Sequence, residues 1–303
     1  MQEKRFTITS NYDEWQIQAF LYAPDEQPKG IVQLVHGMCE YKERYADFMK
    51  YLCEQGYVVA CHDHRGHGDS AESLEQLGYL GDRSGEALVT DALQVTEYLK
   101  TEYPDLPVVL FGHSMGSMVV RCMIREHDDL FQKLIVCGSP SKNPMVGAAI
   151  VLAQIQRVFM GAHHRSKLLT YLSTGKGDER FKGEGKCAWL SKNRANVEKY
   201  LQDPKCRYKF TANGFENLFR LMKRTYVKKG HALKNPQMPV HFVAGQDDPV
   251  IVNEKQWLAA QEFLRKVGYQ KVSGKLYAGM RHEILKEDDR EIVYADLLAF
   301  IEK

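Results

Sequence analysis

Residues 107–116 have the sequence Pro-Val-Val-Leu-Phe-Gly-His-Ser-Met-Gly, an apolar run that ends in G-x-S-x-G and leads into a helix-like segment. Glycines on both sides of Ser114 leave room for a sharp strand-to-helix turn that lifts the serine hydroxyl clear of the backbone. The helix that begins there directs its positive end toward the same point. A serine nucleophile also needs a base and donors for an oxyanion. The stretch predicts a nucleophile at Ser114, and the alternative is a glycine-rich turn with a capping serine.

Strands and helices are expected to alternate on both sides of this stretch. Apolar runs predict strands, and segments with helical periodicity predict the helices between them. The predicted strands are 30–35, 57–61, 108–111, 134–137, 239–244 and 271–277, and the predicted helices are 45–55, 84–102, 117–126, 254–266 and 289–302. Two alternating segments before them, 5–10 and 15–23, predict an antiparallel hairpin at a sheet edge. The pattern indicates an α/β protein with a mostly parallel, doubly wound sheet covered on both faces.

The alternation stops after Pro140 for roughly a hundred residues, a stretch in which helical patterns replace it. Helices are predicted there over 145–160, 196–201 and 214–224. A helical insertion between two strands of a parallel sheet is expected to cap the carboxyl edge, where such sheets bind their ligands. The predicted organisation is therefore a core of residues 1–140 and 236–303, with a helical cap of residues 141–235 inserted after the sixth strand.

The composition is that of an ordinary water-soluble chain, with 303 residues of which 44% are hydrophobic and 26% charged. The first residues lack the apolar run of a signal peptide. The longest apolar run, 145–153, is far shorter than the roughly 20 residues of a membrane-spanning helix. Seven scattered cysteines without a C-x-x-C pair favour reduced thiols and a cytoplasmic location over a disulfide framework.

Charge is distributed unevenly along the chain. Residues 157–234 contain 19 Lys and Arg against 6 Asp and Glu, a net charge of +13, whereas the remainder has 22 against 33, a net charge of −11. Such a block can face an anionic membrane, an acidic substrate or nucleic acid, or it can simply be a solvated surface. Because no recognised nucleic-acid motif occurs, nucleic acid is not expected as a partner. Besides a small-molecule substrate, the expected partner is an anionic membrane, which the basic cap would contact peripherally.

A serine nucleophile of this kind is followed in the chain by an acid and then a histidine, which gives a test of the first motif. His282 is the only histidine after residue 241, and it follows the predicted strand 271–277. Between Ser114 and His282, the turn after strand 239–244 offers two neighbouring carboxylates, Asp247 and Asp248. One of them is expected to accept the Nδ1 hydrogen of the histidine and hold its tautomer. We favour Asp248 and interpret Asp247 as a turn residue.

An oxyanion requires two backbone donors near the nucleophile. The N–H of Met115, which follows Ser114, supplies one. The loop after strand 30–35 supplies the other, because Gly37 lets the chain turn so that the N–H of Met38 points at the site. Both predicted donors are therefore methionine amides.

Residues 61–69 offer a competing chemistry, because they contain H-x-H-x-x-H at His62, His64 and His67. The pattern is similar to the binuclear-metal loop of the metallo-β-lactamase superfamily, in which an aspartate precedes the third histidine. Gly66 occupies that position here, and Arg65 would place a cation beside the metals. A metal site is therefore not expected, and the segment is interpreted as a structured turn.

Together the motifs resemble those of the α/β-hydrolase superfamily. They are His36-Gly37-Met38, D-x-R-G-H-G-x-S at 63–70, G-H-S-M-G at 112–116, the turn 245–250 and the segment 277–283. Within the superfamily the set is most similar to the monoacylglycerol lipase and lysophospholipase branch, which includes serine-aminopeptidase-like members. The resemblance covers the sheet from about residue 15 to the C-terminus, whereas the cap resembles this branch mainly in being helical and apolar.

The resemblance implies a catalytic triad of Ser114, Asp248 and His282, oxyanion amides at Met38 and Met115, and no cofactor. It implies a serine hydrolase that cleaves small single-chain acyl esters, of the monoacylglycerol or lysophospholipid type, through an acyl-enzyme. An amidase or aminopeptidase with the same triad is the alternative. It is disfavoured because the cap offers few carboxylates for a substrate's α-amine. A binding protein without turnover is disfavoured because every triad position is intact.

Five apolar residues of the cap are candidates for an acyl channel, although an apolar stripe of this kind is also typical of simple packing. They are Ile150, Ile155, Phe159, Phe215 and Phe219. Two features depart from the branch. Cys39 stands where many relatives have a small residue, which would narrow the entrance or add a reactive thiol. The cap is also more basic than expected for an enzyme specialised in neutral monoglycerides.

Overall fold

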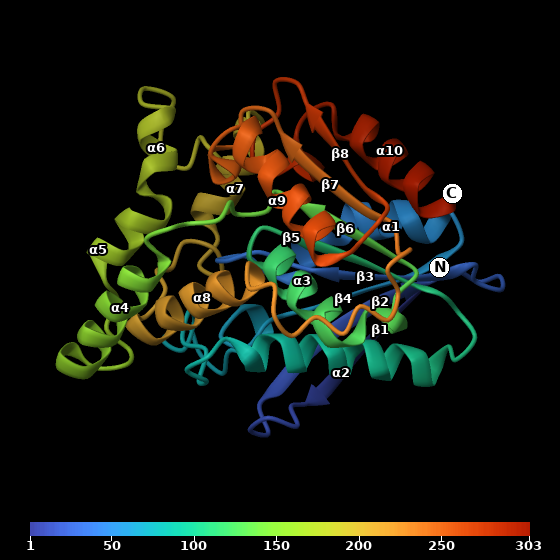
Figure 1. Cartoon of the computed structure of the whole chain (residues 1–303), viewed down its shortest axis with the longest axis horizontal. Coiled ribbons are helices and arrows are strands. Elements are labelled where there is room, and N and C mark those ends of the chain that lie inside the picture. The colour runs from blue at the N-terminus through green and yellow to red at the C-terminus, as the bar shows by residue number, and fades with distance from the viewer.

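The computed structural model describes the backbone of residues 1–303 and all side chains except those of Thr174 and Lys176. Its strands form one eight-stranded sheet in the order β1-β2-β4-β3-β5-β6-β7-β8 (Figure 1). The pairs β1–β2 and β2–β4 are antiparallel, and the other neighbouring pairs are parallel. The strands are β1 (Gln2–Thr9), β2 (Gln16–Ala23), β3 (Gly30–Val35), β4 (Tyr57–His62), β5 (Val108–His113), β6 (Lys133–Cys137), β7 (Val240–Gly245) and β8 (Val272–Tyr277).

Helices cover both faces of this sheet. One face carries α2 (Glu86–Glu102), α3 (Met115–His127) and α9 (Glu254–Val267), and the other carries α1 (Ala46–Glu54) and α10 (Arg290–Glu302). Successive residues of a strand point to opposite faces. Ile31 and Val35 of β3 accordingly join the core with α2 and α3, whereas Val32 joins the core with α1 and α10. The prediction of a mostly parallel, doubly wound α/β sheet is confirmed.

Five α-helices lie between β6 and β7, in residues 141–235, which we call the inserted segment. They are α4 (Val146–Met160), α5 (Lys167–Thr170), α6 (Lys176–Arg180), α7 (Arg194–Gln202) and α8 (Ala212–Thr225). The side chain of Thr211 caps α8 by accepting the N–H of Gly214. In Figure 1, α8 lies between α4 and α3, and it packs against both. α8 therefore joins the outer helices of the inserted segment to the core.

Short helical turns complete the chain. They are the 3-10 helices η1 (Lys42–Tyr45), η2 (Gly68–Ser70), η3 (Asp128–Leu130), η5 (Pro249–Ile251) and η6 (Ile284–Lys286), and the π-helical turn η4 (Tyr171–Gly175). In the part of the chain that the structure describes, no helix is both long and apolar enough to cross a bilayer. The seven cysteines are all unpaired thiols.

Four histidines lie buried where β3 and β4 end: His36, His62, His64 and His67. The backbone N–H of His64 donates to Nε2 of His36 at 3.0 Å, and Nε2 of His64 lies 3.1 Å from the carbonyl oxygen of His36. Burial lowers the pKa of all four rings, to about 4 for His62 and His67. The folded protein therefore holds four neutral imidazoles that the unfolded chain would protonate in mild acid.

We expect acid to destabilise the fold through this cluster. Between pH 6.5 and about 4 the unfolded chain binds more protons than the folded one, so the free energy of unfolding falls as the pH falls. His62→Leu removes a ring with no hydrogen-bond partner among the described residues. The substitution should reduce the change of the free energy of unfolding with pH by up to about 1.4 kcal/mol per pH unit over this range, measured by urea unfolding at a series of pH values. The exposed His163→Leu is the control, and an unchanged slope in His62→Leu would contradict the account.

Candidate active site

Ser114 occupies the turn between β5 and α3. Its backbone has φ 51° and ψ −116°, a conformation that residues other than glycine rarely adopt. Its N–H donates to the carbonyl oxygen of Cys137 at 2.9 Å, which ties the turn to the end of β6. The structure thus has the sharp strand-to-helix turn that G-x-S-x-G predicts, and Ser114 lines a cavity at the carboxyl edge of the sheet.

The two glycines of the motif are required by close packing. A Cβ at Gly112 would lie 2.5 Å from the carbonyl oxygen of Gly116, and a Cβ at Gly116 would lie 2.0 Å from that of Val35. Both distances are shorter than any non-bonded contact allows. The first turn of α3 therefore lies directly against the ends of β3 and β5, and this contact fixes where Ser114 stands.

His282 and Asp248 form a buried pair beside this turn. Nδ1 of His282 lies 2.9 Å from Oδ2 of Asp248, and Oδ1 of Asp248 accepts the N–H of Val250 at 2.8 Å. Asp247 is instead only half-buried, with its side chain 40% exposed and 3.7 Å from the ammonium group of Lys192. Of the two carboxylates in the turn, the structure brings Asp248 to the histidine. His282 lines the same cavity as Ser114.

The loop after β3 closes the site on its other side. A Cβ at Gly37 would lie 3.1 Å from Cβ of Ser114, so the loop backbone runs directly beside the serine. The N–H of Gly37 donates to Oε1 of Glu40 at 2.6 Å, which holds the loop in its turn. Met38 and Met115, the two predicted oxyanion donors, both line the cavity.

Behind the loop lies a buried hydrogen-bond network that the sequence analysis missed. Nδ1 of His113 lies 3.1 Å from Oε1 of Glu40, and Nε2 of His113 lies 3.2 Å from the carbonyl oxygen of His282. Burial alone would lower the pKa of His113, but the hydrogen bond and charge of Glu40 raise it above its ordinary value. A protonated His113 can donate from both ring nitrogens. It then joins the loop that carries Met38 to the loop that carries His282.

The network extends from Glu40 to the inserted segment through Arg44. The guanidinium of Arg44 lies 2.6 Å from Oε1 of Glu283, which directly follows His282. Oε2 of Glu283 accepts the side-chain N–H of Asn196 in α7 at 2.7 Å. Two features of the sequence belong to this network, the histidine inside G-x-S-x-G and the glutamate three residues after Gly37. A single sequence does not reveal that residues 73 positions apart pair.

The cavity over Ser114 has a volume of about 680 Å³ and lies between the core and the inserted segment. Loops that follow β3, β5, β6, β7 and β8 form one wall, and residues from 170 to 222 form the other. Its apolar lining includes Met118, Leu172, Leu190, Phe215, Leu218, Met222 and Val250. A cleft of this size suits a small or single-chain ligand.

The five acyl-channel candidates have different locations in the structure. Phe215 lines the cavity, whereas Ile150 and Phe219 are buried in the core beside it. Ile155 is 49% exposed and Phe159 is 82% exposed, on the outside of α4. α4 directs Ile150 toward α8, and helical geometry then directs Ile155 and Phe159, on the opposite side of the helix, into solvent. The apolar periodicity of α4 could not distinguish these faces.

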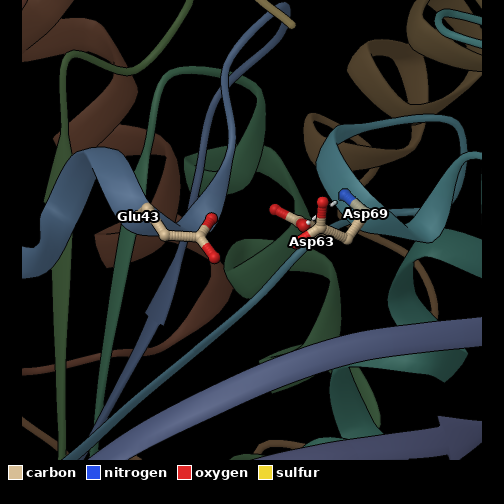
Figure 2. A group of neighbouring side chains, drawn as sticks. All are labelled: Glu43, Asp63 and Asp69. Atoms are coloured by element: carbon tan, nitrogen blue, oxygen red, sulfur yellow. Dashed lines mark hydrogen bonds between the residues drawn. The ribbon is translucent and has the colours of Figure 1, made fainter. Parts of the chain in front are cut away.

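Three carboxylates near the ends of β3 and β4 lie close enough together to hold a metal ion. Figure 2 shows Glu43, Asp63 and Asp69 gathered at one point. The ammonium of Lys42 lies 2.7 Å from Asp63, 2.6 Å from Asp69 and 3.1 Å from Glu43, so a cation already contacts all three carboxylates. A divalent ion would have to displace this buried lysine, and the residues therefore do not fit a metal. The nearby His62, His64 and His67 form no such group among the described residues.

Comparison with known proteins gives consistent matches over nearly the whole chain. The profile of the family described as "Serine aminopeptidase, S33" matches residues 26–289. A monoacylglycerol lipase of Mycolicibacterium smegmatis is 25% identical over 290 residues, which are 96% of this chain and 91% of that protein. The monoglyceride lipase of Homo sapiens is 26% identical over 268 residues, 88% and 79% of the two chains.

Among solved structures, a thermostable carboxyl esterase from Bacillus coagulans in complex with glycerol is similar along its whole length. The TM-score is 0.89 at 28% sequence identity, and the match covers 100% of this chain and 98% of the esterase. The similarity includes the region that corresponds to the inserted segment.

The packing of Gly116 makes a direct stability prediction. Gly116→Ala should cost about 3 kcal/mol or prevent folding, because the new methyl group overlaps the carbonyl oxygen of Val35. Gly147→Ala is the matched control, because a Cβ there meets nothing within 4 Å. It should raise stability by up to about 1 kcal/mol, since alanine favours a helix. Urea unfolding measures both variants, and a Gly116→Ala protein as stable as the parent would contradict the close approach.

Proposed function

Since this chain belongs to the serine aminopeptidase S33 family and is a serine-type α/β hydrolase, we propose that it cleaves carboxylic esters with a single acyl chain through an acyl-enzyme on Ser114. The observation that carries the proposal is the hydrogen bond of 2.9 Å between Nδ1 of His282 and Oδ2 of Asp248, beside a cavity that Ser114 and His282 share. Esters are also the substrates named for the lipase and esterase relatives.

In the proposed mechanism, Asp248 holds His282 in the tautomer that leaves Nε2 available as a base. Nε2 takes the proton of Ser114 as the serine oxygen attacks the ester carbonyl. The N–H groups of Met38 and Met115 stabilise the oxyanion. His282 then returns the proton to the leaving alcohol, and water releases the acid from Ser114 by the same steps.

The charges around the cavity favour an ester over a peptide. An aminopeptidase must hold the α-ammonium group of its substrate with a carboxylate. Of the carboxylates described along the cavity, Glu40 and Glu283 are already bound by Arg44 and, for Glu40, also by His113. Only Asp178 is left for an ammonium, and its Oδ1 accepts the N–H of Cys187 at 2.8 Å. The amidase or aminopeptidase alternative therefore has little to bind its substrate's amine.

We place the acyl chain along α8, in the part of the cavity lined by Phe215, Leu218 and Met222. Leu172 and Leu190 also belong to the apolar lining. Ile150 and Phe219 support this wall from behind through the core. Because residues 141–235 supply these side chains, they act in the proposal as the cap over the active site.

The outer face of the cap is the proposed contact with an anionic membrane. Exposed apolar side chains lie on α4 and the turns after it: Val151, Ile155, Val158, Phe159, Met160, Leu168 and Tyr171. An exposed apolar face is a common means of contact with lipid, and the net charge of +13 over residues 157–234 would attract anionic headgroups. Phe159 and Ile155, first considered for the acyl channel, are assigned to this face.

Substitutions in the triad test the mechanism. Ser114→Ala and Asp248→Asn should each lower kcat/KM for p-nitrophenyl butyrate, on the order of 10³-fold or more. Asp247→Asn, in the adjacent and half-buried position, should stay within about threefold of the parent because its carboxylate does not contact His282. Ser114→Ala should also abolish labelling by a fluorophosphonate. Full activity in Ser114→Ala would eliminate the mechanism, and an equal loss in Asp247→Asn would overturn the choice of acid.

Membrane contact is tested by the double variant Val158→Ser/Phe159→Ser. Removal of two exposed apolar side chains should weaken sedimentation with phosphatidylglycerol vesicles by about tenfold or more. The control, Leu258→Ser/Ile292→Ser, removes exposed apolar residues from α9 and α10 and should bind like the parent. If the parent, the α4 variant and the control variant bound the vesicles equally, α4 would not be part of the membrane contact.

A further inference from the structure

We propose that Trp189, in the inserted segment, is a positioning residue of the reaction: its indole holds the imidazole of His282 and stabilises the protonated form that arises during turnover. The inference rests on the proposed ester hydrolysis. It assigns a part in that reaction to a residue outside the triad, the oxyanion loop and the acyl wall.

The first observation is a contact between two rings. The ring centroids of Trp189 and His282 are 5.2 Å apart, and the ring planes are inclined by 42°. Both residues line the cavity, yet His282 is only 3% exposed, and Trp189 is half-buried. The indole also touches the backbone of α6, because a Cβ at Gly177 would lie 2.8 Å from Cγ of Trp189. The indole is therefore fixed in place, and it is one of the groups that keep solvent from the imidazole.

The second observation is that the backbone around Trp189 is paired with the loop that carries His282. The carbonyl oxygen of Trp189 accepts the N–H of His282 at 3.4 Å, and that of Leu190 accepts the N–H of Glu283 at 2.7 Å. Two consecutive carbonyl oxygens of the inserted segment thus accept two consecutive N–H groups of the histidine loop. Because the backbone makes this pairing, position 189 stays beside His282 whatever side chain it carries.

A buried carboxylate, Glu287, strengthens this pairing. Its Oε2 accepts the hydroxyl of Ser191 at 2.8 Å and the N–H of Lys192 at 2.9 Å, while its Oε1 accepts the N–H of Arg281 at 2.8 Å. The guanidinium of Arg281 in turn donates to the carbonyl oxygen of Ala188 at 2.7 Å. Hydrogen bonds therefore join the two chains on both sides of the ring contact, and the contact is a fixed part of the site.

The proposed reaction creates a positive charge at this contact. When His282 takes the serine proton, its imidazole becomes a cation in a site almost closed to water, where an unbalanced charge is costly. The carboxylate of Asp248 balances the charge at Nδ1. The ring of His113 lies with its centroid 4.6 Å from that of His282. Burial lowers the pKa of His113, but the hydrogen bond and charge of Glu40 raise it above its ordinary value. The protonated His282 therefore has a neighbour that opposes its charge as well as one that balances it.

An indole stabilises such a cation without a charge of its own. Aromatic rings attract a cation within about 6 Å of their centroid, tryptophan most strongly, and the attraction grows where water is excluded. The separation of 5.2 Å between the centroids of Trp189 and His282 lies within this range. The attraction arises only with proton transfer, because the neutral imidazole has no net charge. Trp189 therefore lowers the barrier of the chemical step and contributes to kcat more than to the binding of the ester.

Two substitutions separate the aromatic ring from the volume that it fills. Trp189→Leu keeps an apolar side chain without a ring, and it should lower kcat for p-nitrophenyl butyrate about tenfold while KM stays within about twofold. Trp189→Phe keeps a smaller aromatic ring, and its kcat should stay within about threefold of the parent. If Trp189→Leu does not fold, Trp189→Met supplies a longer side chain without a ring and should show the same loss of kcat.

The matched control, Trp15→Leu, removes a half-buried indole that does not line the cavity. Nε1 of Trp15 donates to the carbonyl oxygen of Ser70 at 2.6 Å, far along the chain from the triad. The control should keep kcat within about twofold of the parent, because it leaves the contact with His282 intact. Urea unfolding of each variant ensures that kcat is compared among folded proteins.

The outcomes separate this inference from the proposed function. If the parent shows no turnover that depends on Ser114, the proposed hydrolysis fails and the inference fails with it. If such turnover exists and Trp189→Leu keeps the kcat of the parent, the hydrolysis stands and the inference alone fails. Equal losses of kcat in Trp189→Leu and Trp189→Phe would mean that the position needs no aromatic ring, and a rise of KM at unchanged kcat would make Trp189 a substrate contact. Either result would overturn the inference.

Discussion

The candidate active site depends on one steric constraint, the contact of the first turn of α3 with the ends of β3 and β5. Gly112 and Gly116 allow this contact, because a Cβ at either would overlap a carbonyl oxygen of the facing backbone. The contact forces the connection into so few residues that Ser114 takes a φ of 51°. The strain is held by the surrounding sheet, and it places the serine beside the loop of Gly37 and the cavity.

A second constraint joins the loops around that serine. His113 lies between Glu40, which holds the loop of Met38, and the carbonyl oxygen of His282. Glu283 continues the connection to Asn196 in the inserted segment. A shift of the inserted segment would therefore be transmitted through these hydrogen bonds to the loop that carries His282. This gives a physical route by which the inserted segment and the proposed triad adopt one arrangement together.

Much of this could be predicted from the sequence, because it depends on local patterns. Apolar runs and helical periodicity predicted the α/β sheet, and the G-x-S-x-G pattern with His282 and the carboxylate turn predicted the residues that the structure gathers at one edge. The pairing of His113 with Glu40 was missed, since it depends on tertiary contact. Ile155 and Phe159 of α4 were predicted to line an acyl channel, but both are exposed to solvent. An apolar stripe on a helix does not by itself show whether its side chains face a cavity, the core or the outside of the protein. Charge in the sequence indicated a basic segment, but only the fold shows which cations border the cavity.

The central claim is that Ser114 carries the acyl group during turnover. Its most direct test is to mix the protein with p-nitrophenyl butyrate, stop the reaction in acid before one turnover is complete, and map the acyl group by peptide mass spectrometry. The account predicts a butyryl group on the peptide that contains Ser114, in an amount that matches the p-nitrophenol released. Turnover with no butyryl group at Ser114, or with the group on Cys39 instead, would contradict it.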